Sequence, residues 1–218
     1  MRRFALSVLF AAMGCAESPE NPSPIGGETE TSGLAQAFDD LSNDVIDLNE
    51  TLASQVDVAA LTRFADCYGR GHDLVFFDLG GSQTAALDAL GDCFASDVVS
   101  EFRFFGAPNG DVLEGLPALV GFIEQFALQS GYNTARNIPG NVNVELLGPD
   151  DALVTYSGNT PHFSVAPTDP KARGFVEWFS ARYTATARRD ADGVWRTTQF
   201  DIEIDEVIRQ EADFPFGQ

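Results

Sequence analysis

The order of two kinds of hydrophobic spacing constrains the fold of this chain more than any other feature. Over most of the first 130 residues, apolar side chains recur every three or four positions, which is typical of helices. From Val142 onwards they alternate with polar ones, as in Val142-Asn143-Val144-Glu145-Leu146, which is typical of strands with one buried face. In this order the helices come first, and short turns then connect the strands. This indicates an α+β domain with a mostly antiparallel, curved sheet.

The spacing also predicts where these elements lie. Helices are expected over residues 34–55, 58–79 and 84–94. Another is expected from Gly115-Leu116-Pro117, because proline fits the first turn of a helix. Strands are expected over residues 98–105, 142–146 and 152–157, then one ending near Arg189 and one over 194–204, with turns at 148–151 and 192–193. Residues 206–218 carry no pattern, and residues 208–218 are expected to form a tail.

The first 14 residues have the features of a secretory signal peptide. Arg2 and Arg3 precede an apolar run that is too short to span a bilayer, and small residues lead to Cys15. The pattern resembles the bacterial lipoprotein signal, although that family usually has leucine where Ala12 stands. The resemblance implies cleavage before Cys15, a lipid on Cys15 and a membrane-tethered protein of the cell envelope. The alternative is ordinary secretion, with cleavage near Ala16 and a soluble exported or periplasmic product.

An acidic composition limits the partners of the chain. It has 33 acidic residues against 13 basic ones, and a formal charge of -20. Such a surface repels phosphate groups, so we expect no nucleic-acid partner and no attachment to anionic lipid through a basic patch. The chain has no second long apolar segment, so we expect no transmembrane helix.

A tether and an amphipathic helix are expected to follow the signal. Residues 15–33 are rich in Pro, Gly, Ser, Thr and Glu, which predicts a disordered tether. Residues 34–55 then form a helix with apolar residues at alternating steps of four and three, namely Leu34, Phe38, Leu41, Val45, Leu48 and Leu52. The stripe suits either docking on the chain's own domain or a short coiled coil in a homodimer. Because it is shorter than three heptads, docking is the preferred interpretation.

Cys67 and Cys93 remain once Cys15 is assigned to the lipid. An oxidising compartment would permit a disulfide between them, but two buried free thiols fit the sequence equally well. Neither lies in a Cys-x-x-Cys motif, and the chain has only two histidines. We therefore expect no metal site.

Four motifs in residues 56–207 resemble the SnoaL-like group of the NTF2-like superfamily. Residues 68–73 are similar to its Tyr-x-Arg-x-x-Asp motif, and residues 93–97 to its passage out of the helices. Gly115 stands where a glycine opens the third helix, and Arg182-Tyr183 with residues 193–196 resembles its closing hairpin. The resemblance implies a cone-shaped α+β domain, in which N-terminal helices pack against a strongly curved sheet and enclose a pocket. It implies no cofactor.

The resemblance also implies a set of pocket residues. Asp73 would be the base, His162 its acid or orienting partner, and Tyr68 a donor to the substrate oxygen. The apolar wall would come from Phe76, Phe102, Phe104, Phe163 and Phe179. Each polar residue also has a structural interpretation: Asp73 as a solvated helix charge, His162 at a strand end and Tyr68 in the core. His72 is expected on the surface, because neighbours on a helix do not face the same way.

Two departures from the family bear on function. Residues 74–92 are longer than the usual connection, and Asn137 stands where many catalytic relatives have a pocket histidine, four residues before Asn141. Asparagine can donate a hydrogen bond but cannot exchange a proton. The loss of the histidine at Asn137 and the added helix favour a module that binds a small apolar or carbonyl-containing molecule. The alternative is a cofactor-independent isomerase, dehydratase or cyclase that uses Asp73 and His162.

Overall fold

The computed structural model describes residues 28–164 and 174–212. The expected signal, Cys15, most of the tether and the end of the expected tail lie outside these residues. The chain divides into two units, Met1–Asn49 and Glu50–Gln218, and the second holds the sheet. Among the described helices, none has both the length and the apolar character that crossing a membrane requires.

A single long helix replaces the two helices that were expected before residue 79. Helix α1 runs from Glu28 to Phe77, so it also begins inside the segment that was expected to be disordered. Residues 53–57, Ala53-Ser54-Gln55-Val56-Asp57, contain neither glycine nor proline, and nothing there interrupts the main-chain hydrogen bonds. The change in apolar spacing at this point reflects a change in what the helix faces, not its end.

The apolar stripe at the beginning of α1 is exposed. Its six side chains, Leu34, Phe38, Leu41, Val45, Leu48 and Leu52, have between 51% and 74% of their surface accessible. Further along the same helix, Leu61, Phe64, Ala65 and Tyr68 are buried in the core.

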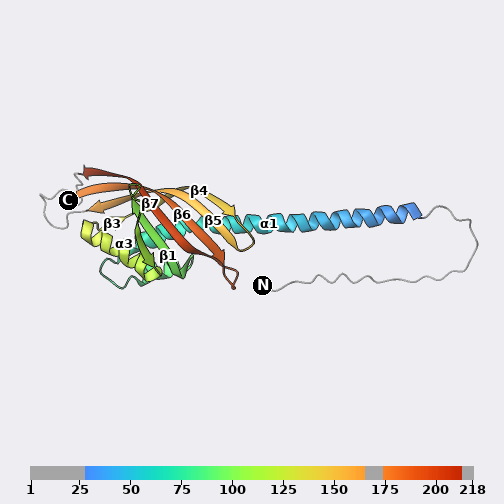
Figure 1. Cartoon of the computed structure of the whole chain (residues 1–218), viewed down its shortest axis with the longest axis horizontal. Coiled ribbons are helices and arrows are strands. Elements are labelled where there is room, and N and C mark those ends of the chain that lie inside the picture. The colour runs from blue at the N-terminus through green and yellow to red at the C-terminus, as the bar shows by residue number, and fades with distance from the viewer. Residues whose placement is uncertain (1–27, 165–173, 213–218) are drawn as a thin grey trace, which may run out of the picture. The chain divides into compact units, whose positions relative to one another are not determined.

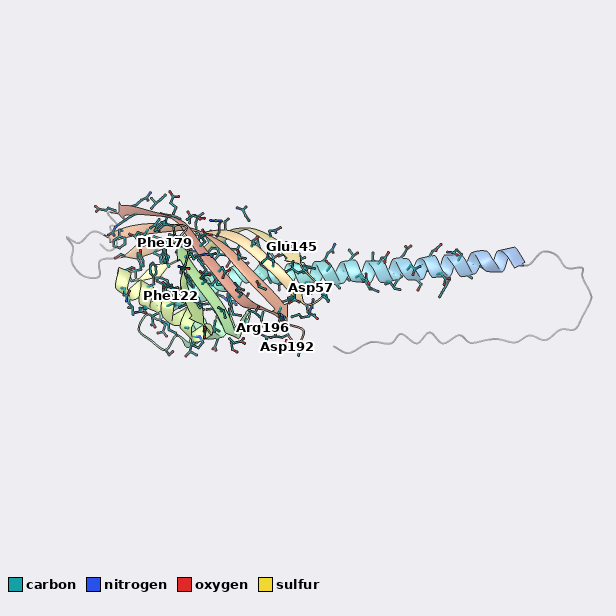
Figure 2. The ribbon with its side chains drawn as sticks, viewed as in Figure 1. Asp57, Phe122, Glu145, Phe179, Asp192 and Arg196 are labelled. Atoms are coloured by element: carbon teal, nitrogen blue, oxygen red, sulfur yellow. A yellow bond between two sulfur atoms is a disulfide. The ribbon has the colours of Figure 1, made fainter. Side chains whose placement is uncertain are left out.

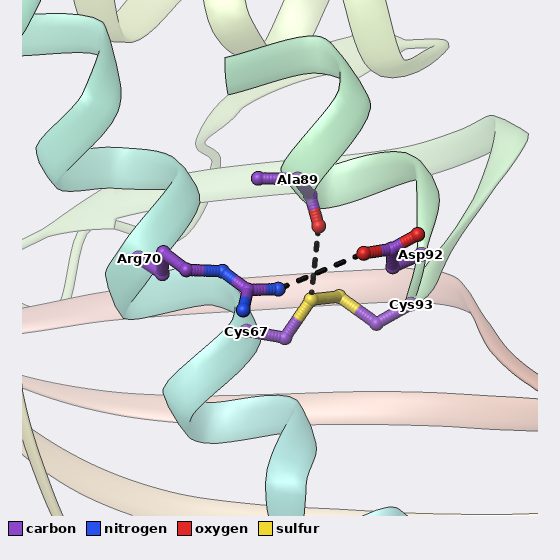
Figure 3. The surroundings of a disulfide bond; sticks show 5 residues. All are labelled: Cys67, Arg70, Ala89, Asp92 and Cys93. Carbon is purple, nitrogen blue, oxygen red and sulfur yellow. Dashed lines mark hydrogen bonds and ion pairs between the residues drawn. A yellow bond between two sulfur atoms is a disulfide. The ribbon is translucent and has the colours of Figure 1, made fainter. Parts of the chain in front are cut away.

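Helix α2, Thr84–Gly91, is joined to α1 by a tight loop and a disulfide bond. In the loop, the Gln83 amide nitrogen donates to the main-chain oxygens of Val75 and Asp78, at 3.3 and 2.7 Å. Cys67 on α1 is bonded to Cys93, which lies just after α2, with 6.6 Å between their Cα atoms (Figure 3). Cys67 and Cys93 are therefore a disulfide pair and not two free thiols. Helix α2 ends three residues before the expected Phe94, which already belongs to a strand.

The rest of the chain forms a mixed sheet and one more helix. The strands are β1 (Phe94–Phe104), β2 (Asp111–Glu114), β3 (Thr134–Ala135), β4 (Ile138–Leu146), β5 (Asp151–Ser164), β6 (Gly174–Arg189) and β7 (Trp195–Ala212). Their order is β2-β1-β7-β6-β5-β3, and β4 also pairs with β5. Only β1 and β7 pair in parallel within the described chain. Helix α3, Leu116–Ser130, begins with Pro117 in its first turn, as expected, and ends at Gly131 in the left-handed conformation.

The sheet curls around the helices, and this confirms the predicted α+β fold class. Shifts of register between β6 and β7, at Ser180/Ala181 and Thr186/Ala187, bend the two longest strands. Alternate residues of β5, β6 and β7 face inward and are buried: Ala152, Val154, Tyr156, Ala181, Tyr183, Ala185, Phe200 and Ile202. Figure 1 shows α3 and the last turns of α1 against the sheet, and Tyr68 of α1 packs on Phe200 with ring centroids 4.8 Å apart. Strand β7 continues to Ala212, beyond the expected end at residue 204, so part of the expected tail is strand.

Gly71 is needed where α1 crosses α2. A Cβ atom added at Gly71 would lie 2.3 Å from Cγ of Leu90, which is fully buried. We expect Gly71→Ala to lower the free energy of unfolding by about 2 kcal/mol, because overpacking outweighs the gain in helix propensity. Gly121 on α3 has no atom within 4 Å of such a Cβ, so Gly121→Ala should instead raise it by about 0.5 kcal/mol. Urea unfolding of both variants tests this, and equal effects of the two substitutions would contradict it.

Candidate functional site

A small apolar cavity lies between α1, α3 and the inner face of the sheet. Its volume is about 50 Å³. The wall is mainly aromatic and aliphatic, and Phe122 of α3 and Phe179 of β6, both labelled in Figure 2, contribute to it from two different elements. The full lining comprises Tyr68, His72, Phe102, Phe104, Phe122, Ile123, Phe126, Thr160, His162, Phe179, Ala181, Tyr183, Ile202 and Ile204. Polar groups are few, so each of them has a strong influence on what the cavity can hold.

His162 lies in this cavity rather than at a solvated strand end. It is only 4% exposed, and the rings of Phe76, Phe126, Tyr132 and Phe179 surround it, with centroids 4.7 to 6.0 Å from its own. Nδ1 donates a hydrogen bond to the main-chain oxygen of Thr160, at 3.1 Å. The pKa of His162 is lowered to about 3, mainly by burial and to a smaller extent by the nearby His72, while the Thr160 hydrogen bond opposes both effects. The imidazole is therefore neutral at neutral pH, with its proton on Nδ1.

Because Nδ1 carries the proton, Nε2 of His162 presents a lone pair. All the residues that line the cavity lie in the described part of the chain. Of these, His162 alone has a buried polar side-chain atom without a hydrogen-bond partner, and that atom is Nε2. A buried acceptor without a donor is unfavourable by roughly 1 to 3 kcal/mol. His162, a lining residue of the cavity, thus has one buried acceptor that is unsatisfied.

His72 lines the cavity, contrary to the expectation that it would be on the surface. It is 5% exposed, and its ring meets the ring of His162 edge-on, with centroids 5.5 Å apart. Nδ1 of His72 lies 3.3 Å from Oδ1 of Asp73. Successive residues of a helix point about 100° apart, and α1 is oriented so that His72 faces inward and Asp73 does not.

Asp73 lies outside the cavity wall, in a shallow groove that also contains Arg70 and Arg136. Its Oδ1 accepts a hydrogen bond from the main-chain nitrogen of Asn137, at 2.7 Å. Asp73 therefore links α1 to the segment before β4, and it does not share a cavity with His162. The geometry therefore does not bring these two residues together as the predicted base and acid.

Asn137 is buried beside the cavity but is not part of its lining. Its amide nitrogen donates to Oγ1 of Thr160 at 3.0 Å and to the hydroxyl of Tyr183 at 3.3 Å. Both acceptors line the cavity, so Asn137 holds them in place from behind. Asn137 thus supports two side chains of the cavity wall.

Tyr68 lines the cavity and also belongs to the core. Burial raises the pKa of its hydroxyl well above the usual value, and the nearby Tyr183 and Asp73 raise it further. The hydroxyl therefore stays protonated and can donate a hydrogen bond. Its ring packs on Tyr183 with centroids 5.6 Å apart.

The expected phenylalanine wall is only partly correct. Phe102, Phe104 and Phe179 line the cavity, whereas Phe76 packs behind His162 and Phe163 is on the opposite face of β5. Strand alternation explains the last error, because His162 faces inward and its neighbour must then face outward. Phe122 and Phe126 were not among the expected lining residues, although both lie on the apolar face of the helix that begins at Leu116.

This geometry, a curled mixed sheet with helices on its inner face around a cavity, defines the NTF2-like class of α+β domains. Residues 53–201 match the SnoaL-like domain, so the chain belongs to this family, and the resemblance inferred from the motifs is confirmed. No curated protein matches the sequence.

Solved structures share the fold at low sequence identity. A hexachlorocyclohexane dehydrochlorinase, LinA Type2, is 15% identical, with a TM-score of 0.53, and the match covers 77% of this chain and 97% of that one. LinA-type3 from Novosphingobium barchaimii is 13% identical, with a TM-score of 0.55 over 77% and 99% of the two chains. A candidate scytalone dehydratase from Novosphingobium aromaticivorans is 15% identical, with a TM-score of 0.52 over 77% and 98%. At these identities the likeness shows the fold alone.

Proposed function

We propose that the domain binds, without turnover, a small and mostly apolar molecule that carries one hydrogen-bond donor. The observation that supports this most directly is Nε2 of His162, an unpaired buried acceptor on a residue that lines an apolar cavity. A hydroxyl or N–H group on the ligand would satisfy it, while the phenylalanines would cover the rest of the molecule. A carbonyl cannot donate to Nε2, so small alcohols and phenols fit this atom better than ketones do.

The size of the cavity limits the ligand. A water molecule needs about 10 to 15 Å³ in this measure, so about 50 Å³ holds only a few non-hydrogen atoms. A phenol-sized molecule requires a rotamer change at the wall. Phe122, which is half-buried on α3, is the side chain we expect to move.

Two observations argue against proton transfer by the expected pair. Asp73 lies outside the cavity wall, and a histidine with a pKa of about 3 carries no proton to donate from Nε2 at neutral pH. Asn137 supplies no replacement, because an amide does not exchange protons in this range. Binding without turnover is therefore the function that the site favours.

A matched pair of ligands tests the proposal. Phenol and toluene have nearly the same shape, but only phenol can donate to His162. We expect the ratio of the toluene Kd to the phenol Kd, measured by NMR titration, to fall about tenfold in His162→Leu, which corresponds to roughly 1.4 kcal/mol. Phe163→Leu, on the outer face of the same strand, should keep the ratio of the unmodified protein. An unchanged ratio in His162→Leu would contradict the proposal.

A second candidate is an isomerase or lyase in which His72 is the base. Its Nδ1 faces Oδ1 of Asp73, so a carboxylate could orient the ring while the other nitrogen acts in the cavity. This function predicts exchange of the α-protons of a small ketone with solvent deuterium, followed by NMR. It also predicts that His72→Gln abolishes the exchange, while Phe163→Leu retains it. Absence of exchange with the unmodified protein would leave only the binding function.

We also propose that the chain is exported and anchored through a lipid on Cys15. The disulfide between Cys67 and Cys93 supports export, because such bonds persist in oxidising compartments. Mass spectrometry of the amino-terminal peptide from bacterial membranes tests the anchor. An unmodified peptide that begins at residue 16 would favour ordinary secretion.

A further inference from the structure

The first turns of α1 carry an exposed apolar stripe, which we define as Leu34, Phe38, Leu41, Val45, Leu48 and Leu52. Leu34, Phe38 and Leu48 are each more than 70% exposed. Side chains of this size forgo the favourable free energy of burial when they stay in water. Single exposed leucines are common, but six in one continuous row on one helix indicate an interaction surface.

The positions of the charged residues define what this surface fits. With the stripe at heptad positions a and d, the flanking e and g positions are Ala35, Ala37, Ser42, Asp44, Asn49 and Thr51, of which only Asp44 is charged. The other four acidic residues of this segment, Asp39, Asp40, Asp47 and Glu50, fall at positions b, c and f, away from the seam. No basic residue occurs between residues 34 and 52.

We propose that the stripe binds the stripe of a second copy of this chain as a short parallel coiled coil. The surface is self-complementary: apolar residues meet apolar residues, and the flanks are neutral except for Asp44. In a parallel pair, position g faces position e of the next heptad, so Asp44 of one copy faces Asn49 of the other and no like charges meet. A basic partner would instead need acidic residues beside the seam, and a membrane surface that carries negative charge would be repelled.

The seam is shorter than three heptads, which makes the dimer weak and dependent on concentration. The outward-facing carboxylates of two copies still repel each other over several ångströms. Salt screens this repulsion, because the Debye length falls from about 30 Å at 0.01 M to about 10 Å at 0.1 M. Association should therefore tighten as the ionic strength rises, unlike association held by ion pairs.

Sedimentation equilibrium of the full chain, at concentrations from one to one hundred micromolar, tests the proposal. We expect the unmodified protein to reach twice the monomer mass of 23.5 kDa. The double variant Leu41→Glu, Leu48→Glu should weaken the dimer at least a hundredfold. Ile46→Glu is the matched control, because Ile46 is also exposed and apolar but lies at position b. All three proteins carry the same amino-terminal segment, so any association through that segment is common to them.

Each other outcome would overturn the proposal. A monomer at every concentration would show that the stripe has a different partner. Equal dimers of all three proteins would place the interface elsewhere on the chain. Co-sedimentation of a monomeric unmodified protein with phosphatidylcholine vesicles, abolished in the double variant, would assign the stripe to a lipid surface. Unchanged cooperative urea unfolding of the sheet domain in both variants confirms that the substitutions act on the seam alone.

Discussion

Loss of the Cys67–Cys93 disulfide is expected to lower the free energy of unfolding by about 3 kcal/mol. The bond closes a loop between residues 26 apart in sequence, and it restricts the unfolded chain more than the folded one. The loop contains Gly71, the tight turn at Gln83 and all of α2, so opening it frees the connection between α1 and β1. Urea unfolding with and without dithiothreitol, monitored by tryptophan fluorescence, measures the effect.

The variant Cys67→Ala, Cys93→Ala separates the bond from the packing of its sulfur atoms. Both cysteines are buried, so the double variant also loses contacts and should be less stable than the reduced protein. Dithiothreitol should then have no effect on it. The bond does not contribute as argued if the reductant lowers the free energy of unfolding of the unmodified protein and the double variant equally, or if it changes neither.

Acidification is expected to destabilise the folded domain through His162. The unfolded histidine binds a proton below pH 6.5, whereas the folded one has a pKa of about 3. Between these values the unfolded state holds more protons, so stability falls as the pH falls, by about 1.4 kcal/mol per pH unit. The loss should reach about 2 kcal/mol at pH 5, whereas His162 adds no pH dependence above about pH 7.

Comparison of the unmodified protein with His162→Leu isolates this contribution from the many carboxylates. The difference in unfolding free energy between the two proteins should be constant above pH 7 and should change by about 2 kcal/mol between pH 7 and pH 5, in the direction that favours the variant. Phe163→Leu should retain the full pH dependence of the unmodified protein. Parallel curves for the unmodified protein and His162→Leu would show that the ring is hydrated or charged in the folded state.

Much of the fold was predictable, because helical and strand periodicity are local properties. The helix after Gly115 and the strand ending at Arg189 lie where the spacing predicts them. The end of a helix is harder to predict when no glycine or proline marks it, and α1 therefore continues through residues 53–57 where a break was expected. Strand β7 extends past residue 204 because β6 pairs with it as far as Ala212, a partner that its own sequence does not reveal.

The candidate site was less predictable, and His72 and Asp73 show why. The sequence placed both on a helix, where neighbours diverge by about 100°, but it could not say which one faces the sheet. Similarly, the family motif indicated a histidine at residue 162 near a pocket, but only the surrounding rings make it neutral and leave Nε2 without a donor.

The sequence by itself determined the α+β class, the SnoaL-like family and the stripe of α1, because each follows from residue types at short, regular spacing. The tertiary structure alone decided that Cys67 and Cys93 are joined and that His72 and not Asp73 lines the cavity. These depend on how the helices are oriented against the sheet, which is set by packing between residues that are distant in the chain.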